Sequence, residues 1–177
     1  AGTSNCALRV SCACACVAPL WWQGEIDDYR DYEKALAALK DQMDCVFVDA
    51  PCTGTGTWRR RPDTKWRVKP KSLETRIEQQ DEVLTKASEF VKPGGRLLYA
   101  TCSFLVEEDE DRVDAFLSKR TGWVQEDAVQ HAAESGLLTD DGLAVIKAGQ
   151  GPSGSVRLTP RSAGTDGFFF AVLRRQS

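Results

Sequence analysis

Several features are scarce or absent in this sequence, and each absence excludes a class of protein. The 177 residues include one histidine, His131, which argues against a Ser-His-Asp hydrolase and against a histidine-ligated metal centre. No run of 18 apolar residues occurs, which excludes a helix that crosses a membrane. The 23 basic residues are balanced by 26 acidic ones. This balance excludes a uniformly basic nucleic-acid coat protein but leaves room for a local basic patch.

The number of cysteines argues against a fully paired, secreted disulfide framework. There are seven of them, an odd number that cannot be fully paired within the chain. Six of them fall into two groups: three alternate near the start of the chain (Cys12, Cys14 and Cys16), and three are spread through its body (Cys45, Cys52 and Cys102). This usage suits a reducing cytoplasm, where we expect the protein to be located. The alternating run is compatible with a soft-metal site, a half-buried strand or an irregular chain end. No Cys-x-x-Cys pair or nearby histidine completes a tetrahedral set, so we predict no metal site.

Hydrophobic periodicity predicts an α/β fold. The predicted elements are a helix from Tyr32 to Met43, a strand over 45–48, a loop over 52–71, a helix from Ser72 to Val91, a strand over 97–102, a helix that opens with the acidic stretch 107–111 and runs to Leu117, and short strands over 143–147, 155–159 and 167–173. Helices that alternate with apolar strands, followed by a run of strands, indicate a parallel sheet with an antiparallel C-terminal end. Residues 1–30 lack clean periodicity and are predicted to be an atypical N-terminal segment, and residues 31–177 contain the α/β unit.

Basic and aromatic residues are concentrated between Trp58 and Lys71. The segment holds seven basic residues and one acid, with Trp58 and Trp66 among them: Arg59, Arg60, Arg61, Lys65, Arg67, Lys69 and Lys71, with Asp63. Basic side chains neutralise phosphates and a tryptophan offers a face for an unstacked base, so this composition predicts nucleic-acid contact. A solvated basic loop remains the alternative. The loop leaves the carboxyl end of a predicted buried strand, where open α/β sheets place their ligands, and this favours the functional interpretation.

Two cysteines follow the ends of predicted strands. Cys52 comes directly after Asp49-Ala50-Pro51, and Cys102 ends the strand over 97–102. If the two strands are neighbours, both thiols and the Asp49 carboxylate open into one crevice. A single internal cysteine is usually a small buried hydrophobe. A cysteine pair beside an arginine-rich loop is different, because nearby cations favour the thiolate form.

Four segments of the sequence resemble RNA cytosine-5 methyltransferases of the Sun (Fmu, Nop, Nol) family. They are Asp-Ala-Pro-Cys-Thr-Gly-Thr-Gly at 49–56, Arg-Arg-Pro-Asp-Thr-Lys-Trp at 60–66, Tyr-Ala-Thr-Cys-Ser at 99–103 and Gly-Thr-Asp-Gly-Phe-Phe at 164–169. The likeness covers about residues 44–175 and corresponds to the C-terminal part of the family's catalytic domain. The fold that the resemblance implies is the class I, Rossmann-like methyltransferase sheet, with S-adenosylmethionine as cofactor and RNA as substrate.

The resemblance also implies roles for individual residues. Cys102 corresponds to the nucleophile, Cys52 to the thiol that helps release the product, and Asp49 to an acid at the cofactor and target-base pocket. The residues expected at the RNA entrance are Pro51, Arg59, Arg60, Arg61 and Lys65. A thiolate that adds to carbon 6 of cytosine makes carbon 5 nucleophilic enough to take a methyl group. The target base has to leave its stack to reach the thiols.

One expected part of the family pattern is not found. The glycine-rich cofactor loop that follows the family's first strand has no counterpart upstream of Asp49, so we expect N-terminal strands of the sheet to be missing. The leading hypothesis is an S-adenosylmethionine-dependent RNA cytosine-5 methyltransferase that acts on ribosomal RNA, or alternatively on transfer RNA. A catalytically inactive RNA-binding fragment of such an enzyme is the alternative. A thiol hydrolase that uses Cys102 and His131 is a weaker third hypothesis.

Overall fold

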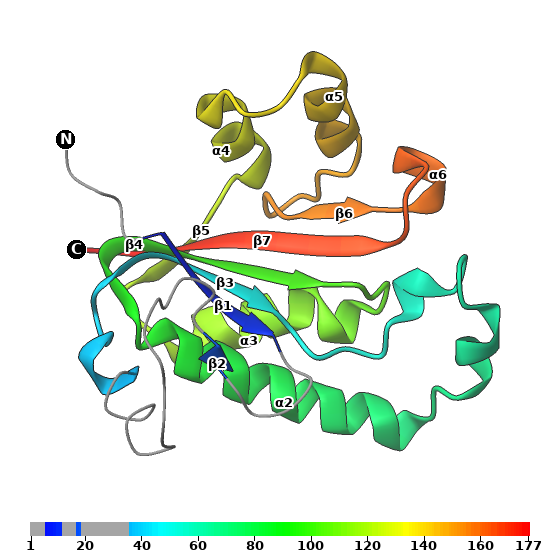
Figure 1. Cartoon of the computed structure of the whole chain (residues 1–177), viewed down its shortest axis with the longest axis horizontal. Coiled ribbons are helices and arrows are strands. Elements are labelled where there is room, and N and C mark those ends of the chain that lie inside the picture. The colour runs from blue at the N-terminus through cyan, green and yellow to red at the C-terminus, as the bar shows by residue number, and fades with distance from the viewer. Residues whose placement is uncertain (1–5, 12–16, 19–35) are drawn as a thin grey trace.

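The computed structural model describes residues 6–11, 17–18 and 36–177. Their strands form one sheet in the order β2-β1-β3-β4-β7-β5, with β6 paired to β7 (Figure 1). Strands β1, β3 and β4 are parallel to one another, and β7 runs antiparallel to β4, β5 and β6. This topology confirms the predicted α/β fold with an antiparallel C-terminal end.

The strands and helices of the described residues have the following bounds. The strands are β1 (Cys6–Ser11), β2 (Val17–Ala18), β3 (Met43–Asp49), β4 (Val91–Thr101), β5 (Trp123–Glu126), β6 (Val156–Leu158) and β7 (Phe168–Arg175). The helices are α2 (Pro70–Ser88), α3 (Glu110–Lys119), α4 (Ala128–Ser135), α5 (Asp140–Ala148) and α6 (Pro160–Ala163). Three short 3-10 helices, η1 (Thr55–Thr57), η2 (Pro62–Trp66) and η3 (Val106–Glu108), lie in the connections that follow β3 and β4. None of the described helices is both long enough and apolar enough to cross a membrane.

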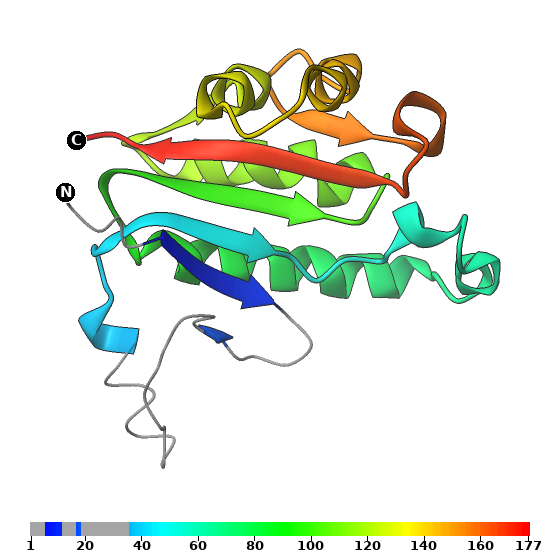
Figure 2. The same cartoon turned by 45° about the horizontal axis from the view of Figure 1, so that its top comes forward.

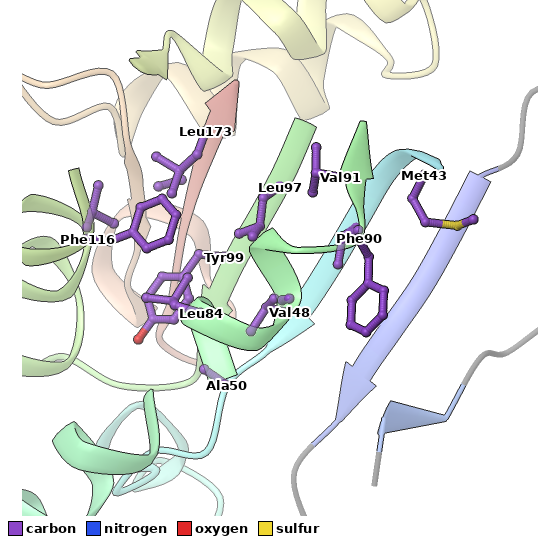
Figure 3. Packing of buried hydrophobic residues seen from close by; sticks show 14 of the residues in the cluster. Met43, Val48, Ala50, Leu84, Phe90, Val91, Leu97, Tyr99, Phe116 and Leu173 are labelled. Atoms are coloured by element: carbon purple, nitrogen blue, oxygen red, sulfur yellow. The ribbon is translucent and has the colours of Figure 1, made fainter. Parts of the chain in front are cut away.

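Helices cover both faces of the sheet (Figure 2). Successive strand residues point to opposite faces, and β4 shows this directly. Leu97 and Tyr99 belong to the large cluster with Leu84 of α2 and Phe116 of α3, whereas Leu98 packs against the smaller cluster formed with α4 and α5. Figure 3 shows the large cluster, where buried aliphatic and aromatic side chains fill the space between α2, α3 and the central strands. Parallel pairing and the packing of α2 and α3 on one face hold β3 and β4 side by side.

Several predicted elements are wrong in type or extent. The strand predicted over 143–147 is part of helix α5, which begins after Thr139, whose hydroxyl accepts a hydrogen bond from the Gly142 N–H. Leu143 and Ile146 pack against the smaller cluster with helical spacing. A short apolar run does not by itself distinguish such a helix from a strand. Helix α2 begins at Pro70 rather than Ser72, and β4 begins at Val91. Strand β5 and helix α4 were not predicted.

The N-terminal region contributes to the sheet. Strand β1 pairs in parallel with β3, although the sequence predicts no strand before residue 45. A six-residue strand is specified by pairing with its neighbour more than by its own local pattern. The alternating cysteines Cys12, Cys14 and Cys16, and the first part of the helix predicted from Tyr32, lie outside the described residues. Of the remainder, residues 36–38 are helical and turns follow.

Candidate active site

Two thiols meet at the carboxyl edge of the parallel strands. Asp49, the last residue of β3, pairs with Ala100 of β4, so both strands end at the same edge of the sheet (Figure 1). Cys52 follows β3 by three residues, and Cys102 comes directly after β4. Their Sγ atoms are 3.4 Å apart. The structure therefore brings together the two cysteines that the sequence predicts to share a crevice.

The contact between the sulfurs makes the two cysteines chemically unequal. The hydrogen bond with Cys52 lowers the pKa of the Cys102 thiol to about 7, although burial and the neighbouring Asp49 and Glu108 carboxyls act in the opposite direction. The same hydrogen bond, reinforced by burial, raises the pKa of Cys52 well above the ordinary value. Of the two thiols, Cys102 is therefore the more acidic one. From the sequence, nearby arginines are expected to favour the thiolate form. In the structure, the largest cause of the lowered Cys102 pKa is instead the hydrogen bond with Cys52.

A buried carboxylate ties the two cysteine loops together. Glu108 is fully buried and accepts hydrogen bonds from the Thr53 N–H at 2.7 Å and the Thr53 hydroxyl at 2.5 Å. The Ser103 hydroxyl donates to the same carboxylate at 2.5 Å, and the Gln80 side-chain amide donates at 3.2 Å. The sequence predicts that Glu108 lies in the exposed first turn of a helix. No local sequence signal distinguishes it from Glu107, which is exposed in the structure.

Asp109 is a second buried acid that the sequence reasoning misses. Its carboxyl accepts a hydrogen bond from the Thr101 hydroxyl at 2.5 Å. Arg157 Nη1 lies 3.0 Å from the other carboxyl oxygen and forms an ion pair with it. The geometry of this contact is not that of a hydrogen bond. Burial raises the pKa of Asp109 to about 7. Because Thr101 precedes Cys102, this cluster fixes the end of β4 next to Cys102.

Two glycines allow the loops around the thiols to touch. The Gly56 N–H donates to the Cys102 carbonyl at 2.9 Å, and the Gly167 N–H donates to the Gly56 carbonyl at 2.9 Å. A Cβ atom on Gly56 would lie 2.3 Å from the Gly167 oxygen, and one on Gly167 would lie 2.2 Å from the Phe104 ring. The close backbone approach therefore requires glycine at both positions. It joins the loops after β3 and β4 to the turn that precedes β7.

The predicted RNA-binding residues fall into two groups. Arg59 and Arg60 form ion pairs with Asp166, which is 6% exposed. Arg61 and Lys65 are exposed and form no ion pair within the described part of the chain. The Lys65 ammonium instead lies 4.7 Å from the ring centroid of Trp66, a side chain that is 79% exposed.

Pro51 and Asp49 are less exposed than the basic residues. Pro51 is buried, and its carbonyl accepts a hydrogen bond from the Gln80 amide at 2.7 Å. Asp49 is half-buried and pairs with Ser11 of β1 on one side and Ala100 of β4 on the other. A half-buried carboxylate at the carboxyl edge of parallel strands suits the hydroxyl and amino donors of a nucleoside cofactor.

His131 lies apart from this site. It is in α4 and lines a cavity of about 170 Å³ with Arg96 and Glu126, and neither Cys52 nor Cys102 lines that cavity. The described residues contain no group of His, Cys, Asp and Glu side chains that could hold a metal ion.

Comparison with known proteins shows the family of the chain. A family model described as "16S rRNA methyltransferase RsmB/F" matches residues 23–174. The chain belongs to this family. The predicted resemblance to the Sun family is thereby confirmed. The ribosomal RNA small subunit methyltransferase B of Shewanella oneidensis is 33% identical over 153 residues, which cover 86% of this chain and 28% of that protein. The protein of the same name from Vibrio cholerae is 32% identical over 169 residues, which cover 95% of this chain and 30% of that protein.

Solved structures show the same fold. The crystal structure of PH0851 has a TM-score of 0.64 and 32% identity, over 77% of this chain and 27% of that one. NSun6 from Pyrococcus horikoshii, solved with SFG, has a TM-score of 0.57 and 26% identity, over 75% of this chain and 30% of that one. The class I, Rossmann-like fold is confirmed. The chain spans less than a third of the length of each of these four relatives.

Proposed function

We propose that this RsmB/F family protein is an S-adenosylmethionine-dependent methyltransferase that modifies carbon 5 of cytosine in ribosomal RNA through a covalent adduct with Cys102. The observation that carries the proposal is the thiol pair, with its sulfurs 3.4 Å apart at the edge where β3 and β4 end. A thiolate beside a protonated thiol supplies both a nucleophile and a later proton acceptor.

The inequality of the two thiols gives them separate roles. The Cys102 sulfur adds to carbon 6 of the cytosine, and the electron pair of the 5,6 double bond becomes available at carbon 5, where the methyl group is gained. Cys102 is then an uncharged thioether, so the hydrogen bond that raises the pKa of Cys52 no longer exists. Cys52 can release its own proton to solvent and accept the proton from carbon 5. The carbon–sulfur bond then breaks, which restores the 5,6 double bond and the Cys102 thiolate.

S-adenosylmethionine supplies the methyl group from its sulfonium when it is bound. Among the described residues, Asp49 is the one that we place against the cofactor. Its carboxylate is half-buried at the end of β3, between the pairing positions of β1 and β4. Calorimetric titration of S-adenosylmethionine tests this role, with Asp49→Ala as the variant. Binding that the substitution abolishes supports the assignment, and unchanged binding overturns it.

The exposed part of the basic segment is the proposed RNA entrance. Arg61 and Lys65 are the cations of the predicted set that form no ion pair within the described residues, and the exposed Trp66 offers a stacking face beside them. Arg59 and Arg60 contribute charge while anchored on Asp166. Ribosomal RNA is favoured over transfer RNA because the relatives from Shewanella and Vibrio are named for it. A cytoplasmic location is proposed because the two thiols have to stay reduced.

Adduct trapping tests the proposed reaction. With 16S ribosomal RNA and S-adenosylmethionine, we expect the Cys52→Ala chain to accumulate a protein–RNA band on a denaturing gel, because product release is blocked. Cys102→Ala and the double substitution should give neither that band nor methylated RNA. Methylation by Cys102→Ala overturns the proposal. Salt-sensitive RNA binding without methylation, unchanged by either substitution, supports instead an RNA-binding unit without catalytic activity.

A further inference from the structure

The residues that directly follow the two cysteines share one hydrogen-bond acceptor. Thr53 follows Cys52, and both its N–H and its hydroxyl donate to Glu108. Ser103 follows Cys102, and its hydroxyl donates to the same carboxylate. The two loops come from different strands, so the carboxylate of Glu108 is a direct link between them.

The surrounding hydrogen bonds all support Glu108 as the acceptor. Because Ser103 gives its single hydroxyl proton to Glu108, the Thr55 hydroxyl, 3.1 Å away, has to donate to Ser103. Consistent with this direction, Thr55 accepts from the Phe104 N–H at 2.8 Å and Ser103 accepts from the Leu105 N–H at 3.0 Å. Each hydroxyl thus has a defined donor and acceptor role, and the chain of donors ends at Glu108.

Glu108 itself is fixed to the sheet. Its carbonyl accepts a hydrogen bond from the Tyr99 hydroxyl at 2.7 Å, and Tyr99 is fully buried in β4. The Gln80 amide of α2 donates both to the Glu108 carboxylate and to the Pro51 carbonyl that precedes Cys52. The carboxylate therefore has one position relative to β4 and α2, and the two cysteine loops are held to it. Charge-assisted hydrogen bonds to a buried carboxylate are among the stronger polar contacts in proteins.

We propose that Glu108 is a positioning residue that holds the Cys52 and Cys102 thiols in contact, acting through Thr53 and Ser103. This inference rests on the proposed function, because the two-cysteine reaction is what requires the thiols to be in contact. Its test is independent of that function, because the effect of the thiol contact on the Cys102 pKa can be measured without RNA or cofactor.

The pKa of Cys102 distinguishes positioning from a simple charge effect. The titratable groups that act on Cys102 are Cys52 and Asp49 from β3 and its loop, and Glu108 from η3. The negative charge of Glu108 by itself raises the pKa of Cys102, so removing only the charge should lower that pKa. Loss of the thiol contact should raise it, because the hydrogen bond from Cys52 is the largest cause of the lowered value. The two explanations thus predict shifts of opposite sign.

The experiment measures the rate of iodoacetamide alkylation of Cys102 from pH 5.5 to pH 10, by mass spectrometry of the peptide that contains it. We expect Glu108→Gln to move the midpoint of the profile upward by about one pH unit, toward the ordinary cysteine value. Thr53→Val and Ser103→Ala each remove one side of the link and should give smaller upward shifts. Glu126→Gln is the matched control, since Glu126 is a partly buried glutamate that pairs with Arg96 and Arg174.

Each outcome decides the proposal. An unchanged or lowered midpoint in a folded Glu108→Gln chain overturns it. If circular dichroism shows that Glu108→Gln does not fold, the two single-link variants decide: upward shifts support positioning, and unchanged midpoints in both overturn it. An upward shift in all three variants without methylation by the parent chain would contradict the proposed function and leave the positioning role standing.

Discussion

The thiol site and the basic segment between Trp58 and Lys71 differ in how they are held. At the thiol site, Cys52 and Cys102 sit on loops fixed by a buried carboxylate and by the contact between Gly56 and Gly167. In the basic segment most side chains are exposed. Bond formation requires atoms placed to within fractions of an ångström, whereas attraction of a phosphate backbone requires charge and little geometry. Arg59 and Arg60 lie between these extremes, since each is half-exposed yet anchored on Asp166.

The largest expected effect comes from breaking the backbone contact that fixes the thiol site. In Gly167→Ala the new Cβ atom would lie 2.2 Å from a carbon of the Phe104 ring and 2.7 Å from the Gly56 Cα atom. We expect the free energy of unfolding to fall by about 3 kcal/mol, as in other overpacked sites. Urea unfolding followed by tryptophan fluorescence measures the change.

Gly142→Ala is the control for that substitution. The nearest atom to a Cβ at Gly142 is the Thr139 hydroxyl oxygen at 3.4 Å, and the residue lies in helix α5. Alanine is the better helix former, so this change should leave stability unchanged or raise it by about 0.5 kcal/mol. Equal losses in the two variants would show that the Gly56–Gly167 contact does not fix the site.

The next effect concerns the anchor of the basic segment. Asp166→Asn removes the buried negative charge that pairs with Arg59 and Arg60. Breaking a fully buried pair costs several kcal/mol, but both arginines are about half exposed, so we expect a loss of about 1–2 kcal/mol in the free energy of unfolding. The control is Asp63→Asn, which removes the exposed ion pair with Arg67 and should cost less than about 0.5 kcal/mol. Thermal melts of the three proteins check the ranking, and equal melting temperatures for the two variants would contradict it.

A smaller effect is expected in the titration of Cys102. Its alkylation rate should rise as the pH increases through about 7, because its pKa is lowered to that value by Cys52. Cys52→Ala removes the donor and should move the midpoint up to about 8.5, the ordinary thiol value. Cys52→Ser keeps a hydroxyl donor at the same place, so its midpoint should lie between the two. The pH dependence of alkylation at Cys102 measures all three; equal midpoints would show that Cys52 does not set the thiolate.

The sequence predicts the strand ends better than it predicts their surroundings. The apolar runs before Asp49 and Cys102 mark two buried strands, and the meeting of their thiols follows once the strands are parallel neighbours. The role of Glu108 cannot be predicted in this way, because its burial depends on how η3 packs against α2 and β4. The anchoring of Arg60 depends on Asp166, which lies 106 residues further along the chain. Local patterns carry no information about partners at such separations.

The smallest effect on stability is expected at Arg61, an exposed residue of the basic segment. Arg61 is exposed and forms no ion pair within the described residues, so Arg61→Ala should change the free energy of unfolding by less than about 0.5 kcal/mol. It should nevertheless weaken RNA binding severalfold at low salt and reduce the slope of log affinity against log salt by roughly one. Arg60→Ala should lower both stability and affinity, because Arg60 also neutralises Asp166. Filter binding of 16S ribosomal RNA at several salt concentrations, together with urea unfolding, separates these outcomes. If Arg61→Ala leaves the salt slope unchanged, phosphate contact at this position is excluded, and the RNA entrance has to rest on Lys65 or on the anchored arginines instead.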